Sequence, residues 1–284
     1  MKSVCKALLF YPKLFYLAYK FLVQTSKSKN TQLQSPDETN PLTWEFSCYS
    51  QNGEDGIINF LINKLNISNK YFIEIGSGFG IENNTTFLAM YRRFSGLMIE
   101  GDKYSSKYCR YFLKSFCLGV DCINFFVDDQ SIEKLKQEIL YNDPDVFSLD
   151  IDGNDYFLVK TIFNAGIRPK IFVVEYNSCY GPTEKLTIVY DKYFNFNNAD
   201  ESNLYYGASI SAWISLFEQN DYSFVTVDSN GVNAFFIDKH QFNESFYKNI
   251  NGLKFRENFY QYKKLKKRWE EQFSIIKNKP FTNL

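Results

Sequence analysis

The sequence YFIEIGSGFGIENNTT, residues 71–86, decides the fold that we expect for this chain. Residues 71–73 form an apolar run of aromatic and β-branched side chains, which is typical of a buried strand. Three glycines follow the acid Glu74 at two-residue spacing, and residues 83–86 offer caps for a helix. A strand, a glycine turn and a helix start predict a crevice whose backbone N–H groups face a nucleotide-like ligand.

The composition limits the classes of function. Lys plus Arg number 32 and Asp plus Glu number 32, so the formal net charge is zero. This balance is unlike the basic surface of a nucleic-acid-binding protein, and we expect no nucleic-acid partner. The six cysteines form no CxxC pair and the chain has one histidine, which argues against a structural zinc site. Free buried thiols favour a cytoplasmic protein.

The chain divides into three predicted regions. Residues 1–45 contain an apolar segment broken by Pro12, Lys13 and Lys20, followed by a polar linker. The segment is too short and too charged to span a bilayer, so we predict an amphipathic helix that packs on protein, on a second copy of the chain or on a membrane surface. Residues 46–240 are the predicted main domain, and residues 241–284 are a helical extension.

Short apolar runs alternate with helical patterns through the main domain. We predict strands near residues 71–75, 96–100, 122–127, 145–151 and 170–175, with helices between them. Residues 222–228 and 233–238 then flank a DSNG turn and predict an antiparallel hairpin. The expected fold is α/β, with a mostly parallel seven-stranded sheet that ends in this hairpin and has helices on both faces.

Acids end most of these predicted strands, at Glu74, Glu100, Asp128, Asp150, Asp152 and Glu175. Open α/β sheets bind ligands beyond the carboxyl ends of their strands, so this series predicts a site rather than isolated ion pairs.

The glycine turn does not match the common nucleotide fingerprints. The dinucleotide motif GxGxxG needs a third glycine where this chain has Ile81, and no Gly-Lys-Ser/Thr follows as in a P-loop. Glu74 is placed to accept a hydrogen bond from an ammonium group of the ligand. Glu100 is placed to accept hydrogen bonds from a ribose diol, and Asp128 is placed to accept one from an adenine amino group. An amine, a ribose and an adenine in that order indicate S-adenosylmethionine rather than NAD.

The motifs SQNGEDG, FIEIGSG, ENNT, IEGD, LDIDGND, VVEYN, GAS and NAFF follow in that order between Ser50 and Lys239. Together they resemble Rossmann-like class I S-adenosylmethionine-dependent methyltransferases, and within them the FkbM-like branch found often among polysaccharide-decorating O-methyltransferases. The resemblance implies an acceptor hydroxyl on a sugar, either nucleotide-activated or linked to a polysaccharide. The cofactor contacts that it implies are Gln51, Asp55, Glu74, Gly76, Ser77, Gly78, Glu100, Asp128 and Asp150.

The acids after the fourth and fifth strands are the candidates for catalysis. Their order resembles the metal site of catechol-type O-methyltransferases, and our hypothesis is that Asp152, Glu175 and Asn177 hold Mg²⁺ or Mn²⁺. A competing hypothesis makes Asp152 or Glu175 a general base without a metal. A third interpretation is that residues 152–155 only cap the next helix.

Four polar side chains border the predicted acceptor side. We expect Asn154, Tyr176, Tyr206 and Ser209 to contact the substrate. Two alternative functions stay open: an NAD-type oxidoreductase, and a noncatalytic binding module on the same fold. The terminal helices are candidates for joining copies of the chain into a homo-oligomer.

Overall fold

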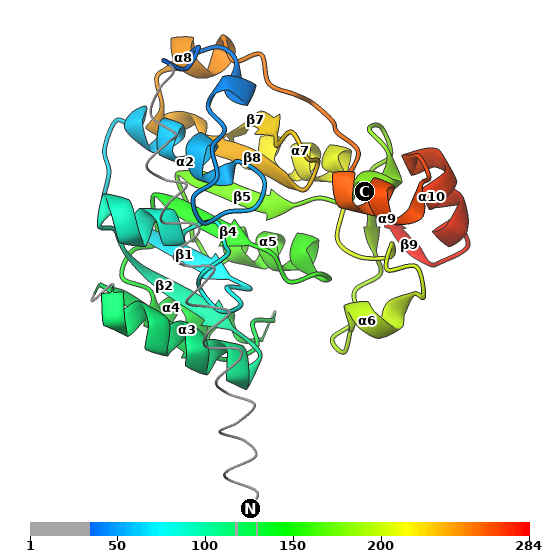
Figure 1. Ribbon diagram of the computed structural model, residues 1–284, viewed down its shortest axis with the longest axis horizontal. Coiled ribbons are helices and arrows are strands. Elements are labelled where there is room, and N and C mark those ends of the chain that lie inside the picture. Colours follow the sequence, from blue (N-terminus) through cyan, green and yellow to red (C-terminus); the bar gives the residue numbers. More distant parts are fainter. Residues whose placement is uncertain (1–34, 117–118, 129) are drawn as a thin grey trace, which may run out of the picture.

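The computed structural model of the protein describes residues 35–116, 119–128 and 130–284 (Figure 1). The predicted amphipathic N-terminal segment and most of the linker after it lie outside these residues. The suggestion that this segment joins two copies of the chain therefore stays a prediction.

A seven-stranded sheet in the order β3-β2-β1-β4-β5-β8-β7 forms the centre of the protein. Neighbouring strands are parallel from β3 to β5, and β8 runs antiparallel to both of its neighbours. The predicted fold class is confirmed. The strands are β1 (Tyr71–Ile75), β2 (Ser95–Glu100), β3 (Val120–Asn124), β4 (Val146–Leu149), β5 (Ile171–Glu175), β7 (Tyr222–Val227) and β8 (Asn233–Asp238).

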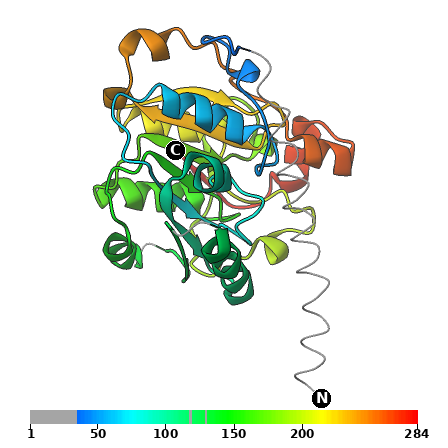
Figure 2. The same ribbon diagram turned by 60° about the vertical axis from the view of Figure 1, so that its left-hand side comes forward.

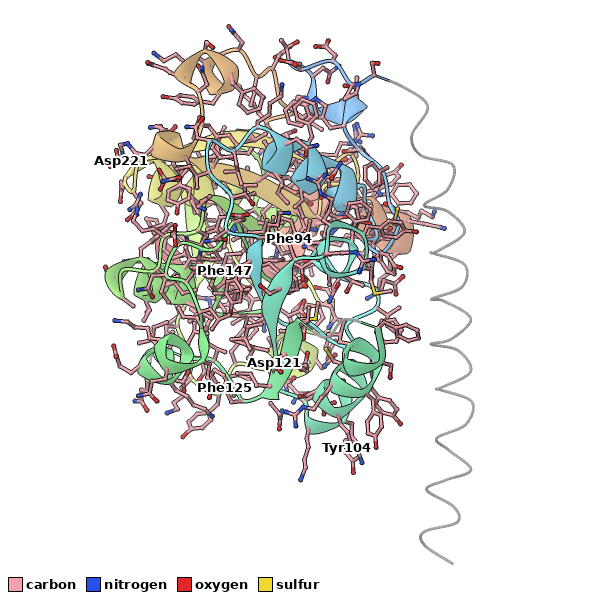
Figure 3. All side chains as sticks on the ribbon, turned by 90° about the vertical axis from the view of Figure 1, so that its left-hand side faces the viewer. Phe94, Tyr104, Asp121, Phe125, Phe147 and Asp221 are labelled. Carbon is pink, nitrogen blue, oxygen red and sulfur yellow. The ribbon has the colours of Figure 1, made fainter. Side chains whose placement is uncertain are left out.

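Helices cover both faces of the sheet because the central strands are apolar on both sides. On one face α2 (Glu54–Asn63) and α3 (Lys103–Phe116) pack on a cluster that includes Phe72 and Val173 (Figure 2). On the other face α4 (Ile132–Glu138), α5 (Asp155–Asn164) and α7 (Ile210–Glu218) pack on a cluster around Phe147, which Figure 3 labels within the molecule.

Two local predictions differ from the structure. The helix expected between the first two strands is a short π-helical turn, η3 (Leu88–Arg92), which is followed by Arg93 in the left-handed conformation. The third strand ends at Asn124, not beside Asp128 as the sequence suggested. Asp128 instead accepts hydrogen bonds from the N–H groups of Gln130 and Ser131, directly before α4.

The segment after β5 contains a strand whose partner is at the other end of the chain. β6 (Leu186–Ile188) pairs antiparallel with β9 (Phe281–Asn283). Both pack in a third apolar cluster that includes Tyr180 and Ile276. The remaining elements are η2 (Pro41–Thr43), η4 (Ser178–Tyr180), α6 (Phe196–Ala199), η5 (Lys239–Gln241), α8 (Glu244–Lys248), α9 (Phe259–Leu265) and α10 (Trp269–Ile276).

The C-terminal elements lie beside the edge of the sheet formed by the carboxyl ends of the parallel strands. α9, α10 and β9 gather beyond the carboxyl ends of the parallel strands (Figure 1). Among the helices of the described residues, none combines the length and the apolar character needed to cross a membrane.

Candidate functional site

A cleft of about 390 Å³ lies at the carboxyl ends of β1, β2 and β4. This is the edge at which open α/β sheets bind their ligands. The cleft brings together residues from three of the predicted strand ends. Its lining includes Gly76, Gly78, Glu100, Phe126, Asp150 and Asp152.

The glycine turn after β1 forms one wall of the cleft. Gly76 has φ +85°, and a Cβ there would lie 1.7 Å from the carbonyl oxygen of Asp150. Gly78 has φ +54°, and a Cβ there would have no atom of the described residues within 4 Å. The first glycine therefore lets β1 and β4 approach closely, and the second leaves an open cradle beside backbone N–H groups.

Glu100 lies at the end of β2, and hydrogen bonds to both of its oxygens fix its position. Its Oε2 accepts from the N–H of Gly78 at 2.7 Å, and its Oε1 accepts from the N–H of Asp102 at 2.7 Å. A carboxylate oxygen can accept more than one hydrogen bond, so this side chain remains able to bind a ribose diol.

Glu74 and Ser77 are buried beneath this wall. Glu74 accepts hydrogen bonds from the N–H of Asn84, at 3.0 Å, and from the hydroxyl of Thr85. Burial raises the pKa of Glu74 to about 7. Glu74 thus ties the loop after the glycine turn to β1, a structural role that sequence reasoning did not assign to it.

Asp55, in the first turn of α2, is buried. Within the described residues, only one of its two carboxylate oxygens accepts hydrogen bonds. Its Oδ2 accepts from the N–H groups of Cys48, Tyr49 and Ser50 at 2.6 to 3.0 Å. Its Oδ1 is buried and has no hydrogen-bond partner within the described residues. Burial raises the pKa of Asp55 to about 7. The predicted partner Gln51 is exposed in the preceding loop.

Three carboxylates meet beyond β4 and β5. Asp150, Asp152 and Glu175 each place an oxygen within 4.8 Å of the other two. Burial and the neighbouring carboxylates raise the pKa of Asp150 and of Glu175. Asp152 has φ 53°, a backbone conformation that costs free energy in a non-glycine residue and is often found at functional sites. Three close acids with raised pKa values are suited to holding a cation or a proton.

The loop between β4 and α5 is held by a different acid. Asp155 accepts from the N–H of Ile151 at 2.9 Å and from the N–H of Gly153 at 2.8 Å. These bonds hold the loop but do not cap α5, because Asn154 at the N-cap position makes no side-chain capping hydrogen bond. Asn154 donates to the carbonyl oxygen of Asp191 at 2.7 Å and so ties this loop to the segment between β6 and α6.

Asn177, the predicted amide ligand, is buried and hydrogen-bonded at both ends of its side chain. Its Nδ2 donates to the carbonyl oxygens of Leu204 and Tyr206 at 2.7 and 3.0 Å, and its Oδ1 accepts from the N–H of Cys179 at 3.0 Å. Through these bonds Asn177 positions the segment that carries Tyr206.

Tyr206 reaches the acid cluster and is itself held by the C-terminal region. Its hydroxyl donates to Oε1 of Glu175 at 3.4 Å and accepts from Nε2 of Gln261 at 3.0 Å. Gln261 belongs to α9, in a tail where the sequence shows no motif. No pattern in the sequence marks this residue, because only the tertiary structure brings α9 to the carboxyl edge of the sheet.

Three other predicted residues lie apart from the acid cluster. Asp128 lines a separate, smaller cavity with Asn154. The hydroxyl of Tyr176 donates to the carbonyl oxygen of Arg256 at 2.5 Å. Ser209 caps α7, with its hydroxyl oxygen accepting from the N–H groups of Ala212 and Leu186, both at 3.1 Å. These contacts give each residue a structural role.

Comparisons with known proteins find relatives by structure only. No family model and no curated protein matches the chain. An O-methyltransferase from Bacillus cereus in complex with SAH is 14% identical, with a TM-score of 0.44, over 78% of this chain and 88% of that one. An SAH-bound methyltransferase from Podospora anserina is 15% identical, with a TM-score of 0.40, over 60% and 72%. Because these likenesses are remote, the fold assignment stands on strand order and direction, which are those of the Rossmann-like class I methyltransferase fold.

Proposed function

We propose that this protein is an S-adenosylmethionine-dependent O-methyltransferase of the FkbM-like kind and that its acceptor is a hydroxyl group of a sugar. One observation carries the proposal. A single cleft has the open glycine turn and Glu100 in one wall and Asp150 and Asp152 in another. It therefore pairs a nucleoside-binding wall with acids that can receive a proton.

The residues of the cleft fit the proposed cofactor. Gly78 leaves space beside its backbone, and Glu100 has acceptor capacity for a ribose diol. Asp55 is outside the lining of this cleft, and its unused, buried Oδ1 is suited to an ammonium group, which would supply the hydrogen bond that this oxygen lacks among the described residues. When bound, S-adenosylmethionine supplies a methyl group already activated for transfer by its sulfonium.

The chain's own residues have two tasks in this reaction. They must aim the acceptor oxygen at the methyl group, and they must take the proton that this oxygen loses. Asp152 and Glu175 are the candidate bases, because both lie in the cluster that extends from the cleft. Tyr206, as a donor to Glu175, orients that carboxylate.

The same cluster is suited to a divalent cation. Asp150, Asp152 and Glu175 offer three carboxylate oxygens at close range, the ligand type that Mg²⁺ and Mn²⁺ prefer. In this version of the proposal Asp150 takes the place that we first gave to Asn177, whose amide positions the Tyr206 segment. A cation here would lower the pKa of an acceptor hydroxyl that it touches.

Titration calorimetry with S-adenosylhomocysteine, and with NAD⁺ in parallel, tests the proposal. We expect S-adenosylhomocysteine to bind at micromolar concentrations and NAD⁺ to show no heat. Binding of NAD⁺ alone would favour the oxidoreductase alternative. The absence of binding for both ligands at near-millimolar concentration would favour a noncatalytic module.

A further inference from the structure

Helix α9 is fixed at several points to the carboxyl edge of the sheet. The hydroxyl of Tyr260 donates to Oδ1 of Asn52 at 3.1 Å, in the loop before α2. Gln261 donates to the hydroxyl of Tyr206 on the other side. At the start of α9, the N–H of Phe259 donates to the carbonyl oxygen of Asn230 at 2.8 Å. The helix therefore connects the loop before α2, the turn between β7 and β8, and the segment that carries Tyr206.

A directed chain of hydrogen bonds links α9 to the proposed base. Nε2 of Gln261 can only donate, so the Tyr206 oxygen is the acceptor in that bond. The Tyr206 proton is then available for Oε1 of Glu175.

The remaining polar atom of Gln261 is unused. Oε1 of Gln261 is buried and has no hydrogen-bond partner within the described part of the chain. A buried acceptor without a hydrogen-bond partner destabilises the fold. A ligand hydroxyl that donates to Oε1 after a small movement of the side chain would remove that destabilisation.

We propose that Gln261 is an acceptor-binding residue, and that its Oε1 accepts a hydrogen bond from a second sugar hydroxyl next to the one that faces Glu175. This proposal rests on the proposed function. Gln261 and Glu175 are separated by one bridging hydroxyl, that of Tyr206. A vicinal diol suits this spacing, because each of its hydroxyls contributes one hydrogen bond of roughly 2.8 Å.

The test uses the full chain saturated with S-adenosylhomocysteine and methyl hexopyranosides of the gluco, galacto and manno series as probes. Their affinities are measured by saturation-transfer difference NMR. Gln261→Met keeps the side-chain length and removes both polar atoms of the amide, whereas Gln261→Glu keeps an acceptor oxygen. Lys264→Met, at an exposed position of α9, is the matched control.

We expect at least one methyl hexopyranoside to bind the unmodified protein. Gln261→Met should weaken that binding by about 10-fold, as expected for one hydrogen bond. Gln261→Glu should recover most of the loss, and Lys264→Met should bind like the unmodified chain. The affinity for S-adenosylhomocysteine should be the same in all four proteins.

A deoxy glycoside separates direct contact from a structural effect. The glycoside that lacks the hydroxyl facing Gln261 should bind the unmodified protein about as weakly as the parent glycoside binds Gln261→Met. That substitution should cause no further loss with the deoxy glycoside. Additive losses, unchanged glycoside binding in Gln261→Met, or no glycoside binding to the S-adenosylhomocysteine complex would each overturn the inference. Failure of S-adenosylhomocysteine itself to bind would instead reject the proposed function, and calorimetry detects that separately.

Discussion

The backbone N–H of Gly78 donates to Oε2 of Glu100 at 2.7 Å, and this bond joins the glycine turn after β1 to the end of β2. It aligns the carboxylate beside the open space next to Gly78. The two residues lie 22 positions apart in the chain, and the parallel pairing of β1 with β2 brings them together.

Replacing the Glu100 carboxylate should weaken cofactor binding. Glu100→Gln keeps the shape of the side chain but removes the charge that strengthens a hydrogen bond to a ribose diol. We expect the affinity for S-adenosylhomocysteine to fall by about 10- to 100-fold, since such bonds contribute roughly 1.5–3 kcal/mol. Calorimetry measures this effect, with Glu133→Gln at an exposed position of α4 as the control. Equal affinities in both variants would remove Glu100 from the site.

Alanine variants of two matched glycines distinguish the effect of backbone strain from the effect of filling the ligand space. Gly78 and Gly166 both have positive φ, and a Cβ at either one would meet no atom of the described residues within 4 Å. Alanine at each position should therefore destabilise the protein similarly, by about 1 kcal/mol. Only Gly78→Ala should abolish binding of S-adenosylhomocysteine, because its methyl group enters the cleft. Thermal unfolding and calorimetry together check both statements, and intact binding in Gly78→Ala would contradict the proposed cofactor position.

The acid cluster should bind a divalent cation. We expect Mn²⁺ titrated into the protein to show binding by electron paramagnetic resonance. Asp152→Asn should weaken this binding by about 10-fold or more, since it replaces a charged ligand with a neutral one. Asp121→Asn, at an exposed position of β3 labelled in Figure 3, serves as the control. Methyl transfer that persists unchanged in excess EDTA would leave Asp152 or Glu175 as a metal-free base.

Stability should fall as the pH rises from about 5 to 8. Burial raises the pKa of Asp55 from 3.8 to about 7 and that of Glu74 from 4.5 to about 7. Between these values the folded state holds more protons than the unfolded state, so the free energy of unfolding decreases with increasing pH. The loss begins near the ordinary pKa values and is complete above the raised ones.

Urea unfolding at pH 5, 6, 7 and 8 measures this dependence. We expect a decrease of at least about 1 kcal/mol over the range, and a flatter profile in Asp55→Asn, whose amide has no charge to bury. His240→Gln, at an exposed position, should follow the profile of the unmodified chain. A free energy of unfolding that rises between pH 5 and 8 would show that Asp55 and Glu74 are ionised at no cost in the fold.

Local patterns in the sequence were sufficient to predict most of the sheet. The apolar runs that contain Phe72, Val146 and Val173 predicted buried parallel strands, and the hairpin around the DSNG turn was found in place. The π-helical turn at Leu88–Arg92 was not predictable, since π and α turns share the same residue preferences and differ by how the chain packs. β6 was missed because its partner, β9, lies at the far end of the chain.

The sequence by itself predicted the ends of most strands, and hence that Glu100, Asp150 and Glu175 stand at one edge of a sheet. The direction of each strand follows from the apolar runs and from the connections between them, and both can be read from the sequence. The tertiary structure decided what each acid does there. Within the residues that the structure describes, Glu74 accepts a hydrogen bond from Thr85, one oxygen of Asp55 has no hydrogen-bond partner, and Gln261 donates to Tyr206. These assignments depend on contacts between distant segments, which the chain acquires only when it packs.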